Sequence, residues 1–177
     1  MPLGISEEEF MGVAQAAHDI GLKIEIAGGL PIFELAPSIV HQGDLFEIAK
    51  SIRKGPRAET SGCACYVASD VLIRFPDGSY RRPDLSIFCS RPPRVRTAVT
   101  QVPTAVVEAL SPSSIVKDVH LSPSWYLSQG VKDVFLYDPE GLTVAHIREG
   151  GEERHGVPTE LETETGCLVG FPQPPED

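Results

Sequence analysis

Residues 104–113 read TAVVEALSPS, an apolar run that holds one carboxylate, Glu108, ahead of a Ser-Pro-Ser segment. A continuous apolar run of this length is typical of a strand that is buried on both faces of a sheet. A carboxylate in such a strand is costly unless it is paired, hydrogen-bonded or bound to a cation. Glu108 is therefore the first candidate for a functional side chain.

A second acid lies upstream, after a turn signal. Asp77-Gly78 predicts a hairpin, and Asp84, directly after Pro83, falls on its second arm. If the two acids lie on adjacent strands, their carboxylates and the Ala109 carbonyl form an oxygen cage that suits Mg²⁺ or Mn²⁺. Such an ion can activate water and stabilise charge on a phosphoryl group. The structural alternative is that Asp84 is a turn residue at a strand edge and that Glu108 pairs with an arginine.

The rest of the chain alternates between helical and strand patterns, and 177 residues suffice for one domain with its own core. These patterns predict an α/β protein of the α+β type. Predicted helices cover residues 6–21, 39–54 and 122–129. Predicted strands fall within 22–38, 63–69, 71–75, 85–88, 104–110, 132–137, 142–147 and 167–171. We divide the chain into an N-terminal helix (1–21), a central domain (22–148) and an acidic C-terminal extension (149–177) with room for one added strand.

The charge distribution limits the function classes. The net charge of −10 argues against a protein that coats nucleic acid over its whole surface. Ten of the fifteen basic residues fall within 50–96 and give that segment a net charge of +6. The segment permits a local phosphate-binding face, and the alternative is an ordinary solvated surface.

The cysteines and the hydropathy pattern bear on location. The four cysteines include no C-x-x-C pair and have no neighbouring histidine, so the sequence predicts free thiols and no zinc site. No apolar run reaches the 18 residues of a membrane-spanning helix, and the acidic N-terminus lacks the features of a signal peptide. Together these observations predict a cytoplasmic protein that does not enter a membrane.

Four segments occur in an order and spacing that is found in one protein family. They are Ile24-Glu25-Ile26, Arg82-Pro83-Asp84-Leu85, VVEALSPSS at 106–114 and GVKDVFLYDP at 130–139. They resemble the Uma-two family of restriction endonucleases, within the PD-(D/E)XK nuclease superfamily. The resemblance covers about residues 22–148. It implies a restriction-endonuclease-like fold, which is a mixed, curved central sheet flanked by helices.

The resemblance also implies roles for the matching residues. Asp84, Glu108 and the Ala109 carbonyl would bind Mg²⁺ or Mn²⁺. Glu25 would orient the metal-bound water, and Arg82 would neutralise a substrate phosphate unless it is only a surface charge of the hairpin. The implied activity is metal-dependent hydrolysis of DNA, with duplex DNA as the expected partner. Members of the family are often dimers, so the resemblance also allows a homodimer.

The chain departs from the family pattern at the catalytic lysine. The superfamily position, two residues after the acid, holds Leu110, and the family's alternative position on the next helix holds Ser122. Lys117 lies nearby, but five residues turn a helix by about 140°, so it reaches the site only if Pro123 reorients the chain. The runner-up interpretation is therefore a pseudo-nuclease, impaired in catalysis, that binds nucleic acid or protein. A protein-interaction domain with no role on DNA is a third.

Three other side chains have simpler structural interpretations. His41, with Gln42, lies near a helix start, where a capping or packing role is simpler than a functional one. Trp125 and Tyr126 are expected in the core and would stack on a base only if they were exposed. The other four histidines show no metal-ligand spacing.

Overall fold

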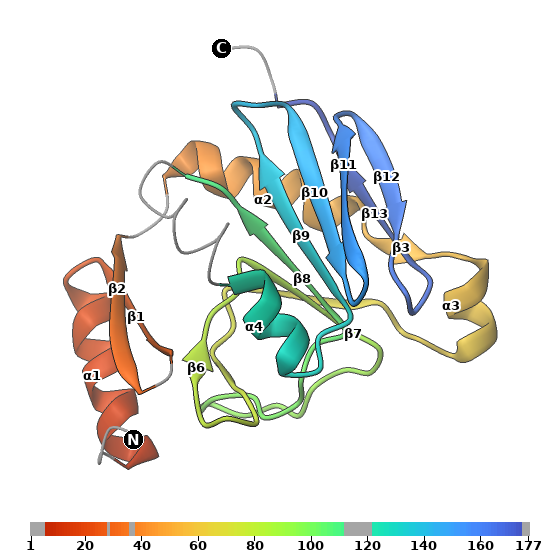
Figure 1. Ribbon diagram of the computed structural model, residues 1–177. Coiled ribbons are helices and arrows are strands. Elements are labelled where there is room, and N and C mark those ends of the chain that lie inside the picture. The colour runs from red at the N-terminus through yellow and green to blue at the C-terminus, as the bar shows by residue number, and fades with distance from the viewer. Residues whose placement is uncertain (1–5, 28, 36–37, 112–121, 175–177) are drawn as a thin grey trace.

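The computed structural model describes residues 6–27, 29–35, 38–111 and 122–174, and Figure 1 shows how its elements are arranged. The helices are α1 (Glu7–Asp19), α2 (Ile39–Ser51), α3 (Pro56–Ser61) and α4 (Ser122–Ser128). The first strands are β1 (Leu22–Ala27), β2 (Leu30–Leu35), β3 (Arg53–Lys54), β4 (Tyr66–Ser69), β5 (Ile73–Arg74), β6 (Tyr80–Arg81) and β7 (Leu85–Phe88). The later strands are β8 (Ala105–Ala109), β9 (Asp133–Asp138), β10 (Thr143–Arg148), β11 (Gly151–Gly156), β12 (Thr159–Glu162) and β13 (Cys167–Phe171). None of the helices in these residues is long and apolar enough to cross a membrane.

The strands form three sheets around which the helices pack. The central sheet has six strands in the order β11-β10-β9-β8-β7-β4. It is mixed, because β8 and β9 run parallel while its other neighbouring strands run antiparallel. A four-stranded sheet, β2-β1-β6-β5, packs against α1, and a three-stranded sheet, β12-β13-β3, packs against α2. The predicted α+β fold, a mixed central sheet with flanking helices, is confirmed.

Alternate side chains of β8 point to opposite faces of the central sheet and belong to two different layers of the core. Val107 and Ala109 belong to a cluster with residues of α2 and β13, whereas Val106 belongs to a second cluster with Tyr126 of α4. All of β8 is buried, as expected for a strand covered on both faces. Figure 1 shows α4 in front of the central sheet and α2 behind it. Because Glu108 is two residues from Val106, it shares the face that α4 covers.

One predicted strand pairing is wrong. The turn at Asp77-Gly78 joins β5 to β6, but β7 does not continue this hairpin. Instead β7 pairs with β4 and β8 in the central sheet. Pro83 lies between β6 and β7, and a proline cannot donate to a strand ladder, which favours a break there. Asp84 therefore lies at the start of a central strand rather than on a hairpin arm.

The C-terminal segment contributes to the core. The predicted strand at 167–171 is confirmed as β13, and β11 and β12 precede it. Val169 and Phe171 of β13 are buried in the same cluster as Leu45 and Ile48 of α2. The segment therefore covers the α2 side of the central sheet.

Candidate active site

The two predicted acids meet where β7 begins and β8 ends. Leu85 pairs with Val107 in the antiparallel register, which sets Asp84 beside Glu108. The Asp84 N–H donates to Glu108 Oε2 at 3.1 Å. The Ala109 N–H donates to Asp84 Oδ2 at 2.9 Å. Each carboxylate is therefore fixed by the backbone of the other strand.

Glu108 is 5% exposed, and a tyrosine holds its other oxygen. The Tyr126 hydroxyl donates to Glu108 Oε1 at 2.7 Å from α4. Burial raises the pKa of Tyr126 well above its ordinary value, and the negative charges of Glu108 and Glu25 raise it further. The phenol therefore keeps its proton and remains a fixed donor to the carboxylate.

Asp84 lies nearer to the surface and contacts a histidine. His41 Nε2 lies 3.3 Å from Asp84 Oδ2. This hydrogen bond raises the pKa of His41, although burial acts in the opposite direction. The cap at the start of α2 is Ser38, whose Oγ accepts from the His41 N–H, whereas the His41 side chain contacts Asp84 and does not cap the helix. No group of the described residues donates to Asp84 Oδ1, which leaves this oxygen open to a ligand.

A buried arginine contacts Ser122, which stands where the resemblance implies a lysine. Arg81 is 3% exposed, donates to Ser122 Oγ at 2.8 Å, and has its Nε 3.5 Å from Glu25 Oε2. Its guanidinium also lies over the Trp125 ring, 4.9 Å from the centroid. Burial lowers the pKa of Arg81, but the nearby negative charges, with Glu25 first among them, outweigh burial and raise it. The only indication in the sequence that Arg81 belongs to the site is its place directly before the Arg82-Pro83-Asp84 element.

The other predicted site residues lie close by or outside the description. Glu25 is 1% exposed, and its Oε1 accepts from the Arg82 N–H at 2.6 Å. The Arg82 guanidinium pairs with Asp70 at 2.9 Å, and Lys23 pairs with the same carboxylate at 2.8 Å. A substrate phosphate would therefore have to compete with Asp70 for Arg82. Lys117 lies outside the described residues.

The basic segment 50–96 is largely neutralised within the chain. Six of its ten cations have a carboxylate within 4.0 Å, namely Lys50, Arg53, Arg57, Arg74, Arg81 and Arg82. Arg91, Arg94 and Arg96 are exposed in the loop that follows β7, at the opposite end of that strand from Asp84. The net charge of the segment therefore overstates its free basic surface near the acids.

The donor set of the acidic pair suits a hard divalent ion. Asp84 and Glu108 offer carboxylate oxygens, and the Ala109 carbonyl follows Glu108 directly in the chain. Mg²⁺ prefers such oxygens and keeps several waters. A carboxylate has about four lone-pair sites, so a carboxylate that accepts hydrogen bonds, as Glu108 does, can also bind an ion. Elsewhere among the described residues, three sulfur atoms lie within 4.8 Å of one another, those of Cys63, Cys65 and Cys167.

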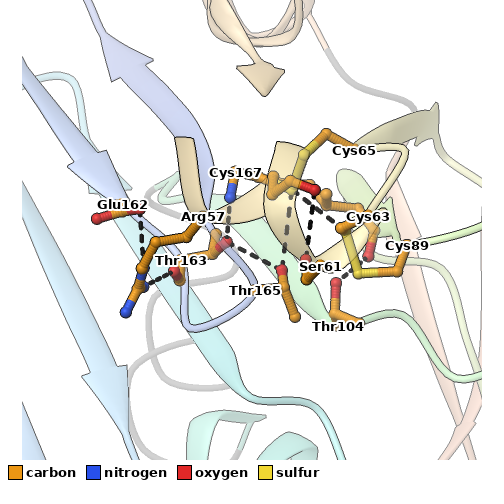
Figure 2. The surroundings of a disulfide bond; sticks show 12 residues. Arg57, Ser61, Cys63, Cys65, Cys89, Thr104, Glu162, Thr163, Thr165 and Cys167 are labelled. Atoms are coloured by element: carbon orange, nitrogen blue, oxygen red, sulfur yellow. Dashed lines mark hydrogen bonds and ion pairs between the residues drawn. A yellow bond between two sulfur atoms is a disulfide. The ribbon is translucent and has the colours of Figure 1, made fainter. Parts of the chain in front are cut away.

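The cysteines are not free thiols. Cys63 forms a disulfide with Cys89, and Cys65 forms one with Cys167 (Figure 2). The prediction of free thiols is wrong, because it rested on local spacing whereas the partners are 26 and 102 residues apart. The two bonds connect the loop before β4 to the end of β7 and to the start of β13.

Comparison with known proteins decides the family. Residues 14–171 match the model of Uma2, described as "Putative restriction endonuclease". The chain belongs to the Uma2 family. A crystal structure of "a putative nuclease belonging to DUF820" from Anabaena variabilis aligns with this Uma2 chain at a TM-score of 0.64 and 22% identity, over 89% of this chain and 88% of that one. At this identity the likeness shows the fold, so the resemblance and the restriction-endonuclease-like fold are both confirmed.

Two further comparisons add nothing to this assignment. The cryoEM structure of a DrdV–DNA complex aligns at a TM-score of 0.33 and 18% identity, over 56% of this chain and 8% of that chain. A likeness this low carries no argument. No curated protein matches the Uma2 chain.

Proposed function

We propose that this Uma2 chain hydrolyses DNA phosphodiester bonds with the help of Mg²⁺ or Mn²⁺, held by Asp84, Glu108 and the Ala109 carbonyl. The observation that carries the proposal is the reciprocal hydrogen bonding between the two acidic residues and each other's strands. Two carboxylates held side by side repel each other, and a bound cation relieves that repulsion. When bound, the ion would activate water and stabilise the charge on the phosphoryl group.

The neighbouring side chains would position the two acids. Tyr126 fixes Glu108 from the α4 side, and His41 contacts Asp84 from α2. Both contacts restrict the carboxylates before an ion binds, which lowers the entropy lost on binding. Protonated His41 would also add a positive charge close to the open side of Asp84.

Arg81 replaces the family lysine only in part. It supplies a cation beside Ser122, but at 3% exposure it cannot touch a substrate phosphate. One well-placed group that stabilises developing charge is often worth about 10²–10³ in rate. We therefore propose a slow nuclease.

A second candidate is a pseudo-nuclease that binds nucleic acid without cleaving it. Two observations favour it, the burial of Arg81 and the ion pairing of most of the basic segment. In this case Lys54, Arg91, Arg94 and Arg96 are exposed cations of this segment that could contact phosphates. Such binding would weaken steeply with added salt.

Plasmid nicking in Mg²⁺ or Mn²⁺ distinguishes these functions. We expect nicking that needs the ion and that falls by about 10²-fold or more in Asp84→Asn and Glu108→Gln. The exposed acids Asp19 and Glu153 provide matched controls, and Asp19→Asn and Glu153→Gln should nick like the wild type. Salt-sensitive binding of duplex DNA without nicking would support the pseudo-nuclease. The absence of both would support a protein-interaction domain.

A further inference from the structure

Four cysteines from three separate parts of the chain converge in one cluster (Figure 2). Cys63 and Cys65 lie in the loop between α3 and β4, Cys89 follows β7, and Cys167 begins β13. The two disulfides are not isolated from each other, because Cys63 Sγ lies 3.7 Å from Cys167 Sγ across the gap between them. The two disulfides are therefore in direct contact with each other.

The spacing of these sulfurs matches a metal–thiolate centre. In a tetrahedral site with Zn–S bonds of about 2.3 Å, neighbouring sulfurs lie about 3.8 Å apart. The 3.7 Å between Cys63 and Cys167 already has this value, although the two are not disulfide partners. The sulfurs of Cys63, Cys65 and Cys167 all lie within 4.8 Å of one another, and all three residues are buried. Cys89 lies outside this group of three but is bonded to Cys63, so after reduction it is the candidate for the fourth ligand.

The surroundings provide outer contacts and a route from solvent. Thr165 Oγ1 lies 3.8 Å from Cys167 Sγ, within reach to donate to a thiolate. A recess of about 380 Å³ reaches Cys63 and Cys89 and is bordered by Arg57 and Thr165. An ion or a small reductant can reach the sulfurs through this recess.

We propose that these four cysteines form a redox-convertible zinc site, with one Zn²⁺ bound by four thiolates when both disulfides are reduced. Reduction by a phosphine takes two electrons per disulfide. Two phosphine molecules and two waters therefore give four thiols and two phosphine oxides. Zn²⁺ then displaces four protons and forms four Zn–S bonds. In either state the cluster ties β13 to the end of β7, so it holds the three-stranded sheet against the central one.

Cobalt spectroscopy of the full chain tests this site, because thiolate ligands give Co²⁺ a charge-transfer band in the near ultraviolet. The wild-type chain, reduced with a phosphine, should bind one equivalent of Co²⁺ with this band and with intense tetrahedral bands in the visible. Zn²⁺ should displace the Co²⁺ and abolish both. The oxidised chain should show neither band, since its sulfurs are bonded to one another. A reduced, folded chain that shows no thiolate band overturns the proposal.

Two variants and one control assign the ligands. Cys89→Ser and Cys167→Ser should weaken Co²⁺ binding by more than the ~10–100-fold that loss of an outer-shell partner costs. Asp84→Asn, which alters the acidic site, should keep the thiolate band unchanged. An unchanged band in both serine variants overturns the proposal. If a serine variant does not fold, circular dichroism of the reduced wild type, with and without Zn²⁺, gives a second readout. Zn²⁺ should raise its unfolding temperature, and no change would contradict the site.

Discussion

Replacing Arg81 with methionine tests the buried charges beside the two acids. Arg81 is 3% exposed and faces Glu25, which is 1% exposed, at 3.5 Å. Methionine keeps much of the side-chain length but removes the charge and the bond to Ser122. The Glu25 carboxylate stays buried after this cation is gone. We therefore expect the free energy of unfolding to fall by about 3–5 kcal/mol, the usual effect of removing one member of a buried ion pair.

Denaturant unfolding, followed by circular dichroism, measures this effect in a double-mutant cycle. The cycle compares the wild type, Arg81→Met, Glu25→Gln and the double variant. Removing both charges relieves the buried carboxylate, so the double variant should be more stable than the two single changes predict, by roughly 1–3 kcal/mol. Arg91→Met is the matched control, because Arg91 is exposed and its loss should cost at most about 0.5 kcal/mol. The reasoning is refuted if Arg81→Met is no more destabilising than Arg91→Met, or if the single effects simply add.

Three further predictions concern the Tyr126 and His41 contacts of the two acids and the cap of the helix that carries His41. Tyr126→Phe removes the hydroxyl that donates to Glu108, a bond worth about 1.5–3 kcal/mol, so the unfolding temperature should fall by roughly 3–12 °C, and an unchanged temperature would contradict the assignment. The pKa of His41 is raised in the folded chain, so its pairing with Asp84 stabilises the fold fully below about pH 6.5 and less as pH rises through the raised pKa. The difference in unfolding free energy between wild type and His41→Asn should therefore shrink as the pH rises over this range, and a constant difference would argue against the pair. Ser38→Ala removes the cap of α2 and should cost about 1 kcal/mol in denaturant unfolding, whereas no loss would mean that the cap is not made in solution.

The sequence identifies the two acids because each stands in a local pattern. The apolar run around Glu108 predicts a buried strand, which is confirmed, but the Asp77-Gly78 turn wrongly places Asp84 on a hairpin arm. Only the pairing of β7 with β8 brings the two acids together. Local patterns also specify α1 through its capping box and β13 through its apolar residues. These features depend on residues that are close together in the chain.

The remaining parts of the site depend on contacts that no local pattern encodes. The burial of Arg81 is set by Ser122 and Trp125, more than 40 residues later, so in sequence it looks like a surface charge of a hairpin. The direction of the His41 side chain depends on how α2 meets β7. The cysteines pair over 26 and 102 residues, and only the packing of β13 against the central sheet brings them together.

Calorimetric titration with Mn²⁺ is the most direct test of the acidic site. The oxidised chain is used, because its cysteines are held in disulfides and cannot compete for the ion. The wild type and the Asp19→Asn control should each bind one Mn²⁺ with the same affinity. Asp84→Asn should bind it more weakly by more than the ~10–100-fold cost of losing an outer-shell partner. Binding that Asp84→Asn leaves intact, or a folded wild type that binds no Mn²⁺, would contradict a divalent-ion site at Asp84 and Glu108.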